Sequence, residues 1–164
     1  MNASSIGEHV CAPVTVRAAT PADTEVVAVF NRLLAAESEG RTLDPVRLER
    51  GVRSILENPS RGRYWLAERN GAVCGQCLVT TEPSDWGAGM YWWLQSVYVD
   101  PDHRRAGAFH ALWEHVAAEA NAAGDVVAIR LYVERGNASA RAVYAGVGME
   151  QTGYVVYELP LSPP

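Results

Sequence analysis

The chain has 164 residues, of which 48% are hydrophobic and 20% are charged, a balance typical of a globular domain with a sizeable core. Its formal net charge of −5 at pH 7 argues against a general nucleic-acid binder, because such proteins carry a basic face. No apolar run approaches the roughly 18 residues that a membrane helix needs, and residues 1–10 lack a signal-peptide pattern. We therefore expect a cytoplasmic protein that binds neither nucleic acid nor membranes.

A strand and two helices are predicted first. Residues 14–20 alternate between apolar and polar side chains, as a half-buried strand does. In 21–38 apolar residues recur at helical spacing, and Thr20 is of a type that caps helices. A second helical pattern covers 45–58 and stops before Pro59, because the residue before a proline disfavours helical geometry.

Three strands are predicted next, at 62–69, 72–81 and 90–99. Asn70-Gly71 separates the first two and is a strong hairpin signal, because a type I′ turn needs positive φ at both central residues. Residues 82–89 predict a loop before the third strand, which is apolar enough to be mostly buried.

The rest of the chain alternates between helices and strands. Helices are predicted at 105–123 and 137–148, and strands at 126–133 and 151–159. The order β-α-α-β-β-β-α-β-α-β has hairpins first and crossovers later, which predicts an α/β domain with a mixed sheet. We expect that domain to span 13–160, between a loosely ordered lead-in at 1–12 and a tail at 161–164.

The strand that ends at residue 99 leads through a tight turn into a helix. The first N–H groups of a helix have no acceptor within it, and the helix dipole is positive there, so this geometry suits phosphate binding. Gly107 and its small neighbours Ala106 and Ala108 leave the backbone open to a ligand. Arg104 and Arg105 add positive charge. On these residues alone, a plain turn with a solvated arginine pair explains the sequence equally well.

A second motif lies in the helix predicted at 137–148. Asn137 stands at the helix start, where asparagine is a common cap, and Tyr144 follows seven residues later. Seven residues are nearly two helical turns, so both side chains point to one side of the helix. Each feature alone is common in proteins, as a cap or as a buried tyrosine.

Together the two motifs resemble the signature of the GNAT superfamily of acyl-CoA-dependent N-acetyltransferases. The family's loop runs Gln or Arg, two residues, Gly, one residue, then Gly or Ala. Arg104 to Ala108 match this loop, and Phe109 stands where the family prefers a small residue. The family's second pattern, N-x-x-A-x-x-x-Y-x-x-x-G-M, is matched by Asn137, Ala140, Tyr144, Gly148 and Met149. The order of elements is similar over nearly the whole chain.

The resemblance implies a single-domain GNAT-like fold, in which about four helices flank a mixed, mostly antiparallel sheet with splayed fourth and fifth strands. It implies acetyl-CoA as co-substrate. We expect no metal site, because His110 and His115 are five residues apart and do not share a helix face. The pantetheine arm would pair with the backbone at 97–99, where one N–H would polarise the thioester, and 105–110 would cradle the pyrophosphate. Asn137 would lie near the pantetheine arm, and Tyr144 would donate a proton to the leaving thiolate. The residues so implied in donor binding are Val97, Tyr98, Val99, Arg104, Arg105, Ala106, Gly107, Ala108, Phe109, His110, Asn137 and Tyr144.

The general base is where this chain departs from the family. Many relatives carry a carboxylate or histidine on the fourth strand, at positions that are Trp93 and Gln95 here. Another position that some relatives use is Tyr132 here. None of these side chains is a base at neutral pH. The remaining alternatives are three carboxylates, Glu82, Asp85 and Glu134, or no dedicated base if the acceptor amine is already partly deprotonated.

Two groups of residues are candidates for the acceptor site. Tyr91 and Trp93 share one face of their strand, and they either belong to the core or line an acceptor pocket. Glu37 and Glu39 lie between the first two helices, where relatives shape the acceptor site. These two carboxylates either attract a cationic amine or are simply solvated.

Cys74 and Cys77 are separated by two residues, the spacing of a redox motif. Redox pairs of this spacing lie at helix N-termini, whereas this pair lies in a predicted strand. Strand alternation predicts that the two thiols lie on opposite faces and favours structural cysteines.

From the resemblance we expect an N-acetyltransferase that moves an acetyl group from acetyl-CoA to a small-molecule or peptide primary amine, by direct attack in a ternary complex. The alternatives are an enzyme specific for protein N-termini, a non-catalytic acyl-CoA-binding or sensing module, and a thiol redox protein. Because relatives are often dimers, a homodimer stays open.

Overall fold

The computed structural model describes residues 12–161. The strands are β1 (Thr15–Ala18), β2 (Arg63–Arg69), β3 (Ala72–Ser84), β4 (Gly89–Val99) and β5 (Val126–Leu131). The α-helices are α1 (Thr24–Glu39), α2 (Pro45–Leu56), α3 (Ala108–Ala123) and α4 (Ala138–Gly146), and three 3-10 turns are η1 (Pro21–Asp23), η2 (Pro59–Arg61) and η3 (Pro101–His103). The expected lead-in and tail lie outside the described residues, except for Ala12 and Leu161. Contacts divide the chain into two units, one ending at Tyr132 and one beginning at Val133.

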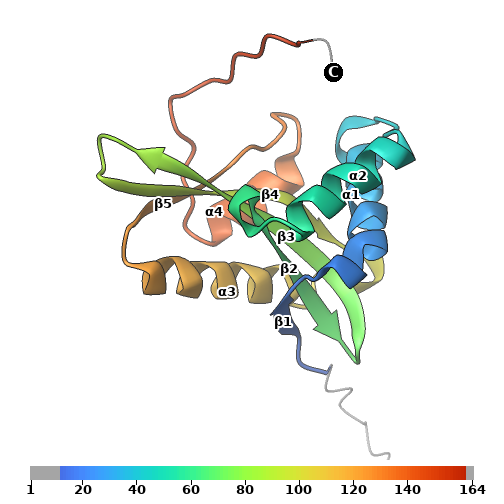
Figure 1. Cartoon of the computed structure of the whole chain (residues 1–164). Helices are drawn as coiled ribbons and strands as arrows, with labels where there is room; N and C mark the ends of the chain where they lie inside the picture. Colours follow the sequence, from blue (N-terminus) through green and yellow to red (C-terminus); the bar gives the residue numbers. More distant parts are fainter. Residues whose placement is uncertain (1–11, 162–164) are drawn as a thin grey trace, which may run out of the picture. The chain divides into compact units, whose positions relative to one another are not determined.

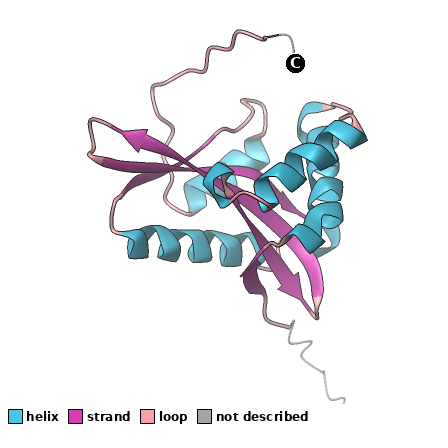
Figure 2. Ribbon diagram, viewed as in Figure 1, coloured by secondary structure: helices cyan, strands magenta, loops and turns pink. Residues whose placement is uncertain are grey.

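The five strands of the first unit form one sheet in the order β1-β2-β3-β4-β5, drawn in magenta in Figure 2. All neighbours are antiparallel except β4 and β5, which are parallel. This mixed, mostly antiparallel sheet with its α-helices confirms the predicted fold class. A parallel pair needs a crossover, and α3 supplies it between β4 and β5.

Helices cover both faces of this sheet (Figure 1). On one face, Leu112 and Val116 of α3 are buried against the strands, with Trp65 and Leu94 in the same cluster. On the other face the buried residues come from α1, α2 and the central strands, and they are Val27, Val52, Tyr64, Leu66 and Leu78. The central strands β2 and β3 therefore contribute buried residues to both clusters, and β4 contributes Leu94 to the cluster on the α3 side.

Local signals account for most element boundaries. Asn70 and Gly71 have φ of 53° and 76°, as the predicted hairpin between β2 and β3 requires. Asp44 caps α2 by accepting a hydrogen bond from the Arg47 N–H at 2.7 Å. Gly40, with φ of 62°, ends α1 in the left-handed conformation that glycine favours.

One predicted loop and one predicted strand differ from the structure. The loop expected at 82–89 is shorter, because Glu82 and Pro83 continue β3 by pairing with Tyr91 and Met90. A proline fits there because the β2 ladder ends at Val79, so β3 is an edge beyond that point. The strand expected at 151–159 is absent, although the sequence alternates, because these residues pair with no other strand in the described chain.

The two cysteines of β3 do not lie on opposite faces. Cys74 and Cys77 are both fully buried in the cluster beneath α3. The reason is a bulge, because Ala67 pairs with Gly75 and Glu68 with Val73, which leaves Cys74 without a partner in β2. An extra residue of this kind shifts the side-chain alternation by one. The expectation of opposite faces is therefore wrong.

Candidate functional site

Strand β4 leaves its neighbour β5 halfway along its length. The parallel ladder ends at the pair Leu94 and Leu131, while β4 stays paired with β3 as far as Val99. Residues 95–99 therefore have no partner in β5. Ser96, within this stretch, has a φ of 47° and interrupts the regular register with β3. A bulge increases local twist, which explains why the two strands diverge here as predicted.

The turn that follows β4 has an unusual backbone. Arg105 and Gly107 both have positive φ, 59° and 90°. The helix therefore begins at Ala108, with Gly107 as its N-cap, rather than at 105 as expected. Glycine is favoured at this φ because other residues are strained there. A Cβ on Gly107 would meet no atom within 4 Å, so the space beside the backbone is open.

The N-terminus of α3 has the geometry of an anion site. The first N–H groups of a helix have no acceptor within the helix, and the dipole adds partial positive charge. No side chain caps this helix, since its N-cap is glycine. Ala108 is buried and Phe109 is half-buried. His110 is exposed, and its imidazole lies 3.1 Å from the Glu114 carboxylate.

Arg104 turns back onto β4 instead of pointing away from it. Its guanidinium donates to the Val99 carbonyl at 2.9 Å and to the Glu37 carboxylate at 2.6 Å. The other oxygen of Glu37 accepts a hydrogen bond from the Tyr98 hydroxyl at 3.1 Å. Burial, together with the Glu37 contact, raises the pKa of Tyr98 to about 12. Glu37, expected at the acceptor site, thus links α1 to Tyr98 at the end of β4, and the charge of Arg104 is paired.

One face of β4 carries an aromatic and charged surface. The ring of Trp93 stacks on Tyr132 with centroids 4.5 Å apart, and its indole N–H donates to Glu82 at 2.7 Å. The guanidinium of Arg130 lies 3.3 Å from the centroid of Tyr91. We call these five residues the aromatic surface. It lies where β4 and β5 diverge, because Trp93 pairs with Arg130 just before the last rung of the ladder.

The other acceptor and base candidates lie apart from the aromatic surface. Glu39 is exposed at the end of α1 and pairs with Arg41 at 3.2 Å. Asp85 lies in the turn between β3 and β4, where its carboxylate accepts the Trp86 N–H at 2.9 Å. Gln95 on β4 donates to the Thr80 hydroxyl at 2.6 Å. Of the two carboxylates proposed as base in the unit that ends at Tyr132, Glu82 belongs to the aromatic surface and Asp85 does not.

The second unit carries the other motif. Asn137 caps α4, accepting the Ala140 N–H at 3.0 Å, as the sequence predicts. Tyr144 lies within α4, and its carbonyl accepts the N–H groups of Val147 and Met149. Glu134 is exposed in the segment before this helix. The roles of these three residues stay predictions.

The sequence profile of the acetyltransferase (GNAT) family matches residues 27–149. The chain belongs to the GNAT acetyltransferase family. This match runs from α1 through α4 and includes both motifs.

Solved structures described as acetyltransferases are similar to this chain over most of its length. A possible acetyltransferase from Clostridium difficile 630 is 35% identical with a TM-score of 0.85, over 92% of this chain and 99% of that chain. A predicted acetyltransferase from Clostridium acetobutylicum, solved with acetyl-CoA, is 18% identical with a TM-score of 0.74, over 90% of this chain and 96% of that one. A ribosomal-protein-alanine N-acetyltransferase from Brucella melitensis biovar Abortus 2308 is 17% identical with a TM-score of 0.73, over 92% of this chain and 100% of that one. These last two similarities concern the fold alone. No curated protein sequence matches the chain.

The sequence analysis of this GNAT protein missed a buried polar network that contacts the β4 bulge at Ser96. The Gln76 amide donates to Asn31 at 2.7 Å and to the Ser96 carbonyl at 3.3 Å, and Asn31 donates to the Tyr64 hydroxyl at 3.0 Å. Gln76 is fully buried. This network fixes the positive-φ residue of β4 from the α1 side. The available signal was a glutamine inside an otherwise apolar strand.

The thiols of Cys74 and Cys77 are free and buried. Burial raises the pKa of Cys74, and it raises the pKa of Cys77 to about 12. Both thiols therefore stay protonated at neutral pH, whereas redox and metal chemistry needs the thiolate.

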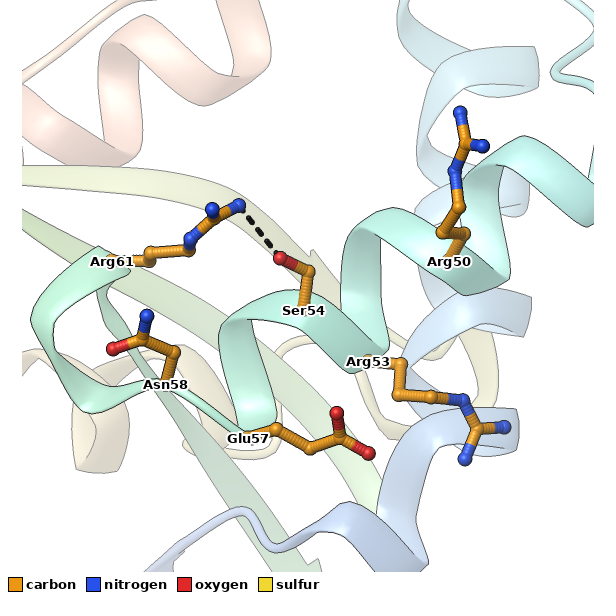
Figure 3. A pocket seen from close by; sticks show the side chains of 6 residues that line it. All are labelled: Arg50, Arg53, Ser54, Glu57, Asn58 and Arg61. Carbon is orange, nitrogen blue, oxygen red and sulfur yellow. Dashed lines mark hydrogen bonds between the residues drawn. The ribbon is translucent and has the colours of Figure 1, made fainter.

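A pocket of about 340 Å³ lies at the end of α2 and in η2, and none of its lining residues belongs to a GNAT motif (Figure 3). Its three arginine side chains point in different directions. Arg53 pairs with Glu49 and Arg61 with Ser54, both at 2.7 Å. The arginines therefore do not converge on one ligand.

Within residues 12–161, no helix is long and apolar enough to cross a membrane. Among the same residues, no cluster of three or more histidine, cysteine or carboxylate side chains is arranged to hold a metal ion.

Proposed function

We propose that this GNAT protein transfers an acetyl group from acetyl-CoA to a primary amine, by direct attack in a ternary complex. The observation that carries the proposal is the continuous segment from the β4 bulge to the first turn of α3. Its strand part, 95–99, has no β5 partner, and its helix part begins at an uncapped N-terminus behind Gly107. A strand edge suits the amides of a pantetheine arm, and a helix N-terminus suits a diphosphate.

The aromatic surface supports an amine as the acceptor. Trp93 and Tyr132 offer ring faces that attract cations, and Glu82 adds a carboxylate beside them. Arg130 lies over both rings of β4, 3.3 Å from the Tyr91 centroid and 5.7 Å from the Trp93 centroid. The exposed members of the surface, Tyr132 and Glu82, are therefore the more accessible ones for an acceptor. The strand position of this surface is the one from which an amine would approach a thioester held by 97–99.

In the proposed reaction the amine nitrogen forms a bond to the acetyl carbonyl carbon, and the carbon–sulfur bond breaks. A backbone N–H of β4 stabilises the charge on the carbonyl oxygen. The Tyr144 hydroxyl gives its proton to the leaving sulfur, and the amine loses a proton to water. Glu82 attracts the amine before this step. No covalent enzyme intermediate is required.

One experiment separates this function from its alternative. The protein is incubated with acetyl-CoA and a panel of small amines and peptides with free N-termini, and acetylated products are identified by mass spectrometry. Turnover of any amine supports the proposal, and products confined to peptide N-termini would identify a protein N-terminal acetyltransferase. The alternative of a binding-only module is favoured by Trp93 and Gln95, which place no titratable base on β4. Saturable acetyl-CoA binding without any product would replace the enzyme by that module.

A further inference from the structure

A buried arginine lies behind the turn that precedes α3. Arg69 is the last residue of β2 and only 8% exposed. Its guanidinium donates a hydrogen bond to the carbonyl oxygen of Ala106. Its Nε is buried and has no hydrogen-bond partner in the described chain, and no carboxylate there forms an ion pair with it. Burying an unpaired charge is costly, so a cation kept in this position calls for an explanation.

The contact with Ala106 fixes the direction of the next N–H group. The structure has no cis peptide bond in the described residues. In a trans peptide the carbonyl of one residue and the N–H of the next point in opposite directions. Because the Ala106 carbonyl faces Arg69 in the interior, the Gly107 N–H faces away from it. The space beside Gly107 is open, since a Cβ built on this residue would meet nothing within 4 Å.

The backbone on both sides of Ala106 has an uncommon conformation. Arg105 and Gly107, on either side of Ala106, both have positive φ. The peptide between Ala106 and Gly107 can rotate in a turn of this type unless one of its polar groups is held. A guanidinium suits this task because it keeps its charge and donates in a fixed direction.

We propose that Arg69 is a positioning residue for the diphosphate of the acyl donor. It holds the Ala106–Gly107 peptide with the N–H toward the ligand, and its buried positive charge acts on the diphosphate from behind the turn. This inference rests on the proposed function, since it assumes a coenzyme A thioester as donor. If the inference is correct, Arg69 affects binding of the diphosphate end of the donor and not of the thioester end.

The test compares two donors, acetyl-CoA and S-acetylpantetheine, which lacks the diphosphate and the nucleotide. Kinetics are measured for the wild type, Arg69→Gln and Arg69→Lys, with Arg63→Gln as a control. Arg63 lies on the same strand, is 56% exposed and loses the same charge. We expect Arg69→Gln to raise KM for acetyl-CoA about tenfold, the usual effect of losing a charge-assisted contact. KM for acetylpantetheine should stay within about twofold, Arg69→Lys should be intermediate and Arg63→Gln should resemble the wild type.

A second measurement needs no variant. In the wild type, the Gly107 amide resonance should shift on titration with coenzyme A and not with pantetheine. Equal losses with both donors would show that Arg69 only supports the fold, and an unshifted Gly107 amide in a protein that binds coenzyme A would refute the positioning role. Failure of the proposed function looks different, because the wild type itself would then make no product with either donor.

Discussion

Two glycine-to-alanine substitutions test the conformation of the turn before α3. Gly107 has φ of 90° and ψ of 0°, where an L-residue costs roughly 1–2 kcal/mol. Gly51 lies within α2, where glycine costs about 1 kcal/mol relative to alanine. A Cβ meets no atom within 4 Å at either position, so neither change creates a clash. The same substitution should therefore destabilise at Gly107 and stabilise at Gly51.

The magnitude follows from the size of the chain. Since 1 kcal/mol shifts Tm by about 2–4 °C at this length, Gly107→Ala should lower Tm by about 2–8 °C, and Gly51→Ala should raise it by about 2–4 °C. Thermal unfolding followed by circular dichroism measures both changes. An unchanged or raised Tm for Gly107→Ala would refute the left-handed conformation at that residue.

The same assay with acetyl-CoA tests the ligand contact. A ligand at a hundredfold excess over its Kd stabilises the folded state by about 2.7 kcal/mol. We expect this stabilisation to be smaller in Gly107→Ala, because the new methyl group enters the space through which the diphosphate approaches the backbone. It should be unchanged in Gly51→Ala. A full acetyl-CoA shift in Gly107→Ala would exclude a backbone contact at this turn.

Three further outcomes are expected. The Tyr144→Phe variant should fold and bind acetyl-CoA normally, while its kcat falls about 10²–10⁴-fold, the usual loss for a positioned acid. If this variant keeps the wild-type kcat under conditions where the chemical step limits the rate, Tyr144 has no part in the mechanism. The double variant Cys74→Ser, Cys77→Ser should lose stability in thermal unfolding but keep acetyl-CoA binding and turnover, because both thiols are buried and protonated; turnover lost in a folded variant would revive thiol chemistry. The Arg17 hydrogen bond lowers the pKa of Asp23 from 3.8 to about 2, so its contribution to stability is present above about pH 4 and is lost as pH falls toward 2. Asp23→Asn should flatten this part of the urea-unfolding profile, and an equal slope in both proteins would contradict the assignment.

The features predicted best from the sequence are those that depend on residues adjacent in the chain. Asn70-Gly71 determines its own turn, and Asn137 its own cap. The strand at 151–159 failed because alternation supplies a suitable surface but not a neighbouring strand to pair with. Cys74 changed face because its bulge arises from pairing with β2.

The candidate site was predicted only in part, for a related reason. The turn at Gly107 can be predicted from the sequence. So can the lack of a general base on β4, where Trp93 and Gln95 occupy the positions that carry one in many relatives. Arg69 and Ala106 are 37 positions apart, and Gln76 and Asn31 are 45 apart, so no local pattern connects them. Only the packed sheet brings these residues together.

The pH dependence of the rate decides how the amine loses its proton. Glu82 is exposed beside Trp93, and an exposed carboxylate pairing with an ammonium group contributes at most about 1 kcal/mol. We therefore expect Glu82→Gln to raise KM for the amine no more than about fivefold, without moving the pH profile of kcat/KM. The rate should rise with pH toward the pKa of the acceptor, and the profile should shift when a less basic amine is used. Asp85→Asn is the matched control, because this carboxylate is also exposed but accepts its hydrogen bond from the Trp86 N–H at the hairpin turn, not from the Trp93 indole. The opposite result would be a pKa on the acidic limb of the kcat/KM profile that stays the same for amines of different basicity. If this pKa also disappears in Glu82→Gln but not in Asp85→Asn, Glu82 is a dedicated base, supplied by β3 in place of one on β4.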